Sequence, residues 1–212
     1  MLDRFRAFWT ALFDPVVRLL LKLGVSPDVV TLVGTLGVCV GAVVFFPRGW
    51  LFAGVLFITA FVFSDLVDGA MARQSGRVSS FGAFLDSTLD RIGDGAVFGG
   101  LAMYYVGPGD NDLLAGLAIY CLVMGSVTSY ARARAESLGM TAKVGIAERS
   151  DRLVSILVMT GLADLFRLAF DNDDFLILIP ITLALLAIAS TITVVQRILT
   201  VRDQAAAAAG EG

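Results

Sequence analysis

Residues 65–90 read DLVDGAMARQSGRVSSFGAFLDSTLD and carry four aspartates, Asp65, Asp68, Asp86 and Asp90, inside a strongly apolar chain. A carboxylate next to hydrocarbon is costly, so four of them at fixed spacing need a compensating positive charge. A divalent cation is the simplest source of that charge, because Mg²⁺ and Mn²⁺ prefer oxygen ligands. The stretch therefore predicts a metal site within an apolar protein.

The composition of the whole chain is that of a membrane protein. Its 212 residues are 57% hydrophobic and only 17% charged, and the mean hydropathy is +0.82. These values do not suit a soluble domain of this length, and they predict a polytopic membrane protein. The chain contains no histidine, which excludes histidine-ligated zinc, Ser-His-Asp triads and histidine general bases.

Six apolar segments are long enough to cross a bilayer, which takes about 20 helical residues. They are residues 29–47, 50–70, 81–106, 113–133, 153–170 and 175–197. The sequence thus predicts an all-α integral membrane protein with a six-helix domain over residues 24–203. Residues 204–212, QAAAAAGEG, form a low-complexity tail that we expect to be frayed.

The first segment, residues 1–23, mixes aromatic and aliphatic side chains with arginine and lysine, and Pro15 interrupts it. This mixture predicts an amphipathic segment that lies in the membrane interface rather than a further span.

Basic residues set the orientation of the predicted spans. With six spans, alternate loops lie on the same side, and 14 of the 16 lysines and arginines fall on the side of the two termini. Only Arg48 and Arg167 fall on the opposite side. By the positive-inside rule, both termini are cytoplasmic, as expected for a multi-pass protein of the plasma membrane.

The four aspartates are predicted to lie together near the cytoplasmic surface. Asp65 and Asp68 come at the end of the second span, and Asp86 and Asp90 lie in the first turns of the third. Spacings of three and four residues put each pair on one helix face, and a polar turn over residues 74–80 makes the two helices antiparallel neighbours. Two metal ions about 3.5–4 Å apart could share such a site and stabilise phosphoryl transfer.

By position, the stretch follows the pattern D-x2-D-G-x2-A-R-x8-G-x3-D-x3-D, which resembles the signature of the CDP-alcohol phosphotransferases. Its eight specified positions are Asp65, Asp68, Gly69, Ala72, Arg73, Gly82, Asp86 and Asp90. Upstream, Ser26 and Pro27 predict a helix start, and the segment that continues through Asp28 and Thr31 is similar to the family's P-[ND]-x-x-T segment.

The resemblance implies an enzyme that transfers a phosphatidyl group from CDP-diacylglycerol to an alcohol and releases CMP. It implies four metal-binding aspartates that hold Mg²⁺ or Mn²⁺, with Asp90 as the base that takes the acceptor's proton. CDP-lipid contacts are implied for Asp28, Thr31, Asp68, Gly69, Ala72, Arg73 and Gly82. Arg73 suits a diphosphate because guanidinium binds phosphate oxygens in a bidentate manner. Members of this kind pair as homodimers, and no nucleic-acid partner is expected.

A cluster of basic residues predicts an acceptor that already bears a phosphate. Residues 129–136 read SYARARAE and residues 145–152 read GIAERSDR, which resembles the actinobacterial phosphatidylinositol-phosphate synthases, whose acceptor is inositol 1-phosphate. By position, the resemblance assigns the acceptor phosphate to Ser129, Arg134 and Arg149, with Arg132 and Arg152 as weaker candidates.

Four alternatives remain open at this stage. Arg73, Arg77 and Arg91 could neutralise the aspartates without a metal, and the other arginines could serve only to set topology. A phosphatidylglycerophosphate synthase would use glycerol 3-phosphate and would need the same kind of basic cluster. A divalent-cation transporter would use the aspartates as a binding site, although transporter sites usually lie near the bilayer midplane.

Overall fold

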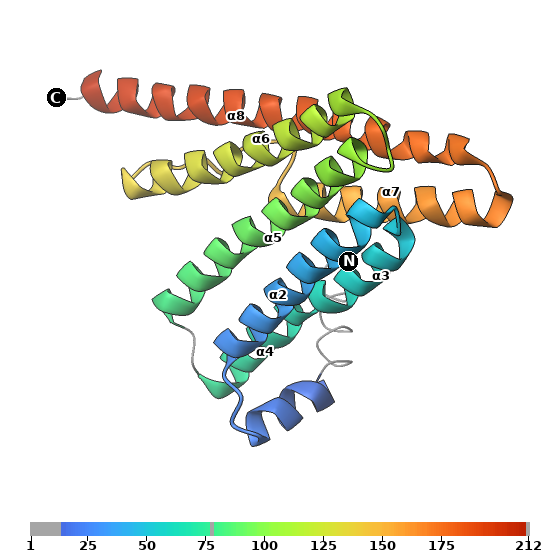
Figure 1. The fold of residues 1–212 in the computed structure, drawn as a ribbon. Helices are drawn as coiled ribbons and strands as arrows, with labels where there is room; N and C mark the ends of the chain where they lie inside the picture. The colour runs from blue at the N-terminus through green and yellow to red at the C-terminus, as the bar shows by residue number, and fades with distance from the viewer. Residues whose placement is uncertain (1–13, 77–78, 211–212) are drawn as a thin grey trace.

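The structure is a computed structural model that describes residues 14–76 and 79–210, apart from the side chains of Asp65 and of residues 209–210. The described residues form helices and contain no β-strand, as the sequence predicts (Figure 1). The helices are α2 (Pro27–Phe45), α3 (Leu51–Val62), α4 (Ser64–Ser75), α5 (Ser80–Val106), α6 (Asp112–Ser137), α7 (Arg149–Phe170) and α8 (Leu178–Gly210), with 3₁₀ turns at Phe46–Arg48 and Asp173–Ile177.

Five stretches of the described chain are long and apolar enough to cross a membrane. They are Pro27–Arg48, Leu51–Ser75, Asp112–Ser137, Arg149–Phe170 and Asp173–Ala208. Helix α5 has 27 residues, but its first half carries Asp86, Asp90, Arg91 and Asp94. Many large apolar side chains are exposed on these helices, which is the arrangement that contact with lipid requires. The chain is therefore a multi-pass membrane protein.

The segment predicted as one span over residues 50–70 is not a single helix. It consists of α3 and α4, which are separated at Phe63. The amide of Leu66 donates to the carbonyl of Phe63, three residues back, at 3.1 Å, so the backbone tightens there into a 3₁₀-type turn. Beyond this break, Ser64 lies against Gly34 of α2, where an added Cβ would collide with the serine hydroxyl. Neither proline nor glycine marks the break, so the sequence pattern did not reveal it.

Helix α2 lies at the centre of the half of the bundle that carries the candidate site. It packs against α3, α4 and α5, and α2 and α5 run side by side (Figure 1). Gly100 of α5 permits a close approach, since a Cβ there would lie 2.7 Å from the carbonyl oxygen of Ala42. Small residues of this kind let helices pack tightly in membranes. In the other half, α6 and α7 pack against α8.

A short helix precedes α2. Residues 14–22 are helical, and Val17 is buried beside Val67, Ala70 and Met71 of α4. Arg18 is exposed and pairs with Asp14 at 2.7 Å. One face of this helix therefore packs on α4, and residues 1–13 lie outside the described chain. That the segment lies in the membrane interface stays a prediction.

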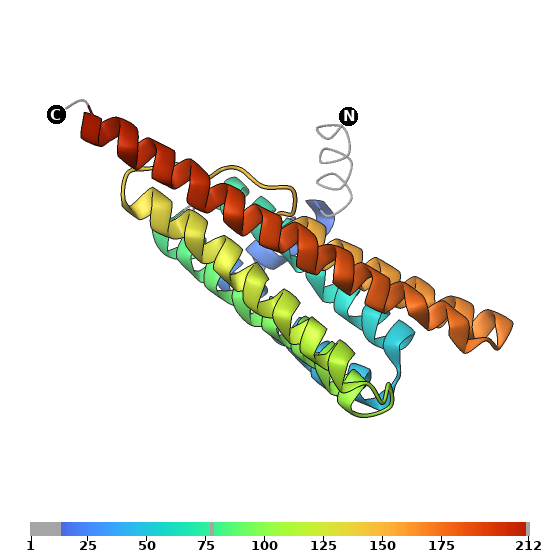
Figure 2. The same ribbon diagram turned by 90° about the horizontal axis from the view of Figure 1, so that it is seen from above.

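The connection between α6 and α7, residues 138–148, runs along α8 as an extended strap (Figure 2). Gln204 of α8 bonds to both backbone groups of Thr141, at 3.0 Å and 2.7 Å. Thr193 accepts a hydrogen bond from the amide of Ala147 at 3.2 Å. These contacts fix the strap where it leads into the first turn of α7.

Helix α8 continues through most of the C-terminal tail. The expectation that the tail is frayed is wrong for residues 204–210, because α8 ends only at Gly210. Alanine has the highest helix propensity, and residues 205–209 are all alanine, so a helix already formed extends through them. Residues 211–212 lie outside the described chain.

Candidate active site

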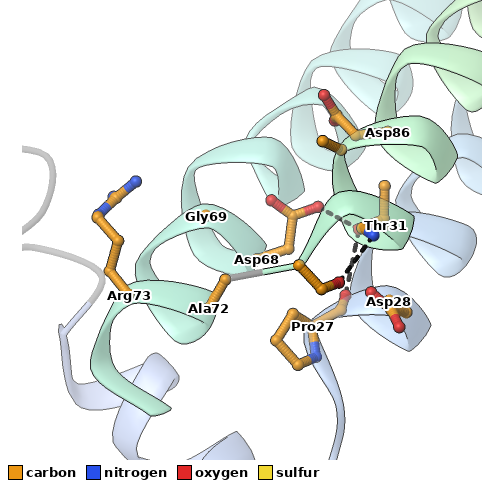
Figure 3. A pocket seen from close by; sticks show the side chains of 11 residues that line it. Pro27, Asp28, Thr31, Asp68, Gly69, Ala72, Arg73 and Asp86 are labelled. Atoms are coloured by element: carbon orange, nitrogen blue, oxygen red, sulfur yellow. Dashed lines mark hydrogen bonds between the residues drawn. The ribbon is translucent and has the colours of Figure 1, made fainter. Parts of the chain in front are cut away.

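A pocket of about 330 Å³ opens between the start of α2, the middle of α4 and the first turns of α5 (Figure 3). It contains all seven residues for which CDP-lipid contacts were predicted. The lining residues are Pro27, Asp28, Thr31, Asp68, Gly69, Ala72, Arg73, Ser79, Gly82, Ala83 and Asp86. The start of α2 thus meets segments of α4 and α5 that begin 37 residues further along the chain, in one polar pocket.

Asp68 is held in this pocket by α2. Its carboxylate is 8% exposed and accepts a hydrogen bond from Thr31 Oγ1 at 2.5 Å (Figure 3). Thr31 lies in the second turn of α2, which begins as predicted, with Ser26 as the cap and Pro27 in the first turn. The helix start therefore fixes a hydroxyl that orients one of the four motif aspartates.

The glycines of the motif leave room beside charged groups. A Cβ at Gly69 would lie 3.3 Å from Nη1 of Arg73, so the guanidinium rests over the bare backbone. A Cβ at Gly82 would lie 3.3 Å from Oγ of Ser79 and 3.6 Å from a carboxylate oxygen of Asp28. Side chains at these positions would narrow the pocket where a diphosphate could approach Arg73.

The motif aspartates do not all occupy the same surroundings. Asp68 and Asp86 line the pocket, and each lies within electrostatic range of the other. Asp90 lies one turn further along α5, and the side chain of Asp65 is not described. Among the described side chains, no three acidic or cysteine groups form a metal cluster. The metal-binding groups that line the pocket are carboxylate oxygens, and Arg73 is the one cation among the described residues of its lining. This chemistry fits a hard divalent cation.

Asp90 belongs to an ion-pair network between α5 and α7. Arg149 Nη1 contacts Asp90 Oδ1 at 2.6 Å, and Arg149 Nε donates to Asp94 Oδ1 at 3.2 Å. Arg91 approaches the other oxygen of Asp94 at 3.5 Å. One arginine from α7 therefore bridges two carboxylates that lie one turn apart on α5.

Two further arginines, one on α7 and one on α8, are buried with no carboxylate of the described residues in direct contact. Arg152 is 2% exposed and Arg197 is 4% exposed. Arg152 donates to the carbonyls of Ala147 and Gly125, both at 3.3 Å. Arg197 donates to the carbonyl of Val144 at 2.9 Å and to a carbonyl of α6. In the described part of the chain, neither has a carboxylate within ion-pair distance, although Asp94 lies within electrostatic range of Arg152, and Glu148 and Glu136 lie within electrostatic range of Arg197. A bound anion in direct contact would compensate these buried charges more fully.

Arg197 was not predicted as a site residue, because it was counted only among the basic residues that set topology. A signal existed in the sequence. Ser190, Thr193 and Arg197 recur at spacings of three and four, which places polar groups on one face of an otherwise apolar helix, and all three are buried.

The remaining acceptor candidates are less buried than Arg152 and Arg197. Ser129 is half-buried, and its hydroxyl donates to the Gly125 carbonyl at 3.2 Å. Arg132 pairs with Glu136 at 3.1 Å, and the exposed Arg134 bonds to Ser137 at 3.3 Å. Both arginines lie on α6 but outside its buried face.

Fold and pocket together define a helical membrane protein whose polar site combines carboxylates with arginines. The sequence profile of the CDP-alcohol phosphatidyltransferase family matches residues 24–201. The chain belongs to this family and is a CDP-alcohol phosphatidyltransferase, an enzyme of phospholipid biosynthesis. This membership removes the cation-transporter alternative.

Within the family, the chain is similar to phosphatidylinositol phosphate synthases. It is 52% identical to that of Streptomyces avermitilis over 210 residues, which cover 98% of this chain and 85% of the relative. Crystal structures of the Mycobacterium tuberculosis phosphatidylinositol phosphate synthase resemble it too. The form with CDP-DAG bound has a TM-score of 0.81 at 43% identity and covers 88% of this chain and 92% of that one. The form in complex with manganese and citrate has a TM-score of 0.80 at 42% identity, and the match covers 88% of this chain and 87% of that one.

Proposed function

We propose that this protein transfers the phosphatidyl group of CDP-diacylglycerol to inositol 1-phosphate, giving phosphatidylinositol phosphate and CMP. The acceptor hydroxyl oxygen bonds to the lipid-side phosphorus, the bond from that phosphorus to CMP breaks, and the hydroxyl proton passes to Asp90. The observation that carries the proposal is a pair of buried arginines, Arg152 and Arg197, that contact backbone carbonyls and form no direct ion pair in the described chain, together with a carboxylate-lined pocket. A phosphorylated acceptor supplies the anion that these arginines lack.

We infer that Asp65, Asp68, Asp86 and Asp90 hold two divalent cations, Mg²⁺ or Mn²⁺. Manganese in the related mycobacterial structure supports this proposal. When bound, such cations neutralise charge on the diphosphate and on the departing CMP. Asp90 acts as the base because the chain has no histidine and because Asp90 lies on the α7 side of α5, beside Arg149.

The CDP-lipid is proposed to occupy the pocket between α2, α4 and α5. Arg73 would bind the diphosphate, while Gly69 and Gly82 leave space for it. An apolar groove of about 370 Å³ lies between the helix of residues 14–22, α2, α3 and α4 and shares α2 with the polar pocket. Its lining of valine, leucine and phenylalanine suits an acyl chain.

For the acceptor side, the proposal keeps Ser129, Arg149 and Arg152 and adds Arg197. Arg132 and Arg134 remain candidates from the resemblance, and their exposure gives them less support than the buried pair receives. Glycerol 3-phosphate is the second candidate acceptor, since two buried arginines suit any alcohol that bears a phosphate.

We further propose six membrane spans, with α3 and α4 counted as one and α5 as the sixth. The helix of residues 14–22 would lie in the interface, and both termini and the site would face the cytoplasm across the plasma membrane. The charge distribution supports this orientation, because only Arg48 and Arg167 fall on the opposite side. The enzymatic domain would span residues 24–203 and pair as a homodimer.

The proposed reaction is tested by CMP release from CDP-diacylglycerol and Mg²⁺ with purified protein. Inositol 1-phosphate, free inositol and glycerol 3-phosphate are compared as acceptors. Turnover with inositol 1-phosphate alone supports the proposal. Turnover with glycerol 3-phosphate alone would keep the mechanism and replace the acceptor, and turnover with free inositol would remove the role proposed for the buried arginines.

A further inference from the structure

Asp94 lies beside the proposed site but outside the eight-position motif, which ends at Asp90. It is one turn deeper on α5 and more buried, with a side-chain exposure of 8% against 19% for Asp90. A carboxylate this buried needs partners, and it has two from different helices: Arg91 at 3.5 Å and Arg149 at 3.2 Å. Asp94 also lies within electrostatic range of Arg152.

Arg149 occupies a position where a cation is disfavoured. It is the first residue of α7, and Glu148 and Asp151 form the capping box at that helix start. The exposed amides at a helix N-terminus carry partial positive charge, so a guanidinium there is repelled. Arg152 adds a second cation in the same first turn. Carboxylates that reach Arg149 from α5 are therefore needed to hold it in place.

Of the two carboxylates that hold Arg149, Asp90 already has other proposed tasks. It is proposed to bind metal and to accept a proton, so its contact with Arg149 cannot stay constant through the reaction. Asp94 has neither task. Moreover, α7 packs mainly against α3 and α8, so the Asp94–Arg149 contact is a link from α5 to a helix supported elsewhere.

We infer that Asp94 is a positioning residue that fixes Arg149, and through it the acceptor side of the site, relative to the catalytic aspartates of α5. The inference rests on the proposed function, because it assigns Arg149 to the phosphorylated acceptor. Asp94 would keep the guanidinium in place if Asp90 turned from Arg149 toward a bound metal ion, which the motif aspartates would hold to neutralise the diphosphate. Arg91 holds the second oxygen of Asp94 and fixes the direction of that carboxylate.

The test measures CMP release at varied acceptor concentration for Asp94→Asn, Arg149→Ala and the double variant. We expect Asp94→Asn to lower kcat/KM for the phosphorylated acceptor by about ten- to a hundredfold, the effect of losing a charge-assisted contact. The KM for CDP-diacylglycerol and the Mg²⁺ concentration for half-maximal rate should stay unchanged. Because Asp94 acts through Arg149, the double variant should be no slower than Arg149→Ala alone.

Asp164→Asn is the matched control. Asp164 is equally buried, at 2% exposure, and pairs with Arg167 at 2.7 Å at the opposite end of α7. It should lower thermal stability and leave kcat/KM for the acceptor unchanged. If Asp94→Asn does not fold, Asp94→Glu takes its place. Glutamate keeps the charge and should fold, but its extra methylene displaces Arg149, so kcat/KM for the acceptor should still fall.

Three results would each overturn the inference. The first is an additive effect of the two substitutions in the double variant, and the second is a loss of kcat/KM in Asp94→Asn no larger than in Asp164→Asn. The third is an unchanged kcat/KM in Asp94→Asn. A shifted Mg²⁺ dependence would also overturn it, since Asp94 would then act as a metal ligand. The assay uses whichever phosphorylated acceptor the wild type turns over. A wild-type protein that turns over neither phosphorylated acceptor refutes the proposed function itself, a result distinct from an active wild type with an unaffected Asp94 variant.

Discussion

At the scale of single residues, the candidate site depends on how each charged side chain is compensated. Asp68 is buried and has a hydroxyl partner in Thr31, whereas Asp90 faces an arginine. Arg152 and Arg197 are buried with backbone carbonyls only. The carboxylate end therefore suits cations, and the arginine end suits an anion, which is the division of charge that a metal-dependent transfer to a phosphorylated alcohol requires.

Asp90→Asn is expected to lower kcat by at least about a hundredfold, the usual contribution of a general base. The amide keeps the shape of the carboxylate but cannot take the acceptor's proton. CDP-diacylglycerol binding, measured by equilibrium titration of the purified variant, should persist. Asp203→Asn on the exposed part of α8 serves as the control and should keep the wild-type rate. A near-normal rate in Asp90→Asn would remove Asp90 from the role of base.

Arg197→Ala is expected to raise KM for the phosphorylated acceptor by about tenfold or more, because a charged hydrogen bond of about 1.5–3 kcal/mol is lost. Arg202→Ala is the matched control, since Arg202 lies on the same helix but is exposed and pairs with Asp203. Initial rates at varied acceptor concentration give the KM of each variant. Equal KM values for the two variants would return Arg197 to a purely topological role.

At the scale of the elements, the sequence predicted helix boundaries correctly where residues close in sequence determine them. Ser26 and Pro27 mark the start of α2, and residues 81–106 match α5 within one residue. The break at Phe63 was missed because neither proline nor glycine marks it; Ser64, next to the break, lies against Gly34 of α2, a tertiary contact that no local pattern encodes. The helical tail was missed because low complexity was taken to outweigh the helix propensity of alanine.

The difference between local patterns and tertiary contacts also explains which site residues the sequence predicted. The motif fixes the pocket of α2, α4 and α5 because its residues lie on two neighbouring helices at helical spacing. Arg197 contacts α6 and the strap, and Asp94, whose helical position the sequence did place on the motif face, contacts Arg149 of α7. These partners are set by packing between helices that are distant in sequence. Such contacts become visible only when the tertiary arrangement is known.

One element junction is predicted to be important for stability. The carboxylate of Asp164 on α7 accepts a hydrogen bond from the amide of Phe52 at 2.7 Å and so caps the start of α3, while pairing with Arg167. Asp164→Asn should destabilise the protein by about 1–3 kcal/mol, the cost of leaving buried groups poorly paired. Thermal unfolding in detergent measures the change. Asp173→Asn, at an exposed position near the same arginine, should shift the midpoint far less, and equal shifts would contradict the capping role.

At the scale of the whole molecule, the two halves of the bundle are proposed to bind one substrate each. The half around α2 holds the pocket proposed for the CDP-lipid, and the half around α8 holds the buried arginines proposed for the acceptor. They meet where Arg149 of α7 reaches α5. In the proposed mechanism, this arrangement puts Asp90, the proposed base, between the two proposed substrate sites.

Removal of divalent cations tests the proposed metal requirement. Treatment with EDTA should abolish CMP release, and added Mg²⁺ or Mn²⁺ should restore it, because the aspartates cannot bind a diphosphate without neutralising charge. The protein should remain folded after chelation, as judged by circular dichroism. Full activity in EDTA would favour neutralisation of the aspartates by arginines alone.

The most direct measurement of the central claim is the mass of the lipid product. CDP-diacylglycerol, inositol 1-phosphate and Mg²⁺ are incubated with the purified protein, and the phosphate content of the product and the CMP released are determined. The account predicts a lipid with one inositol and two phosphates, formed in equal amount to CMP. A lipid with one phosphate, or no inositol-containing lipid from an active enzyme, would contradict it.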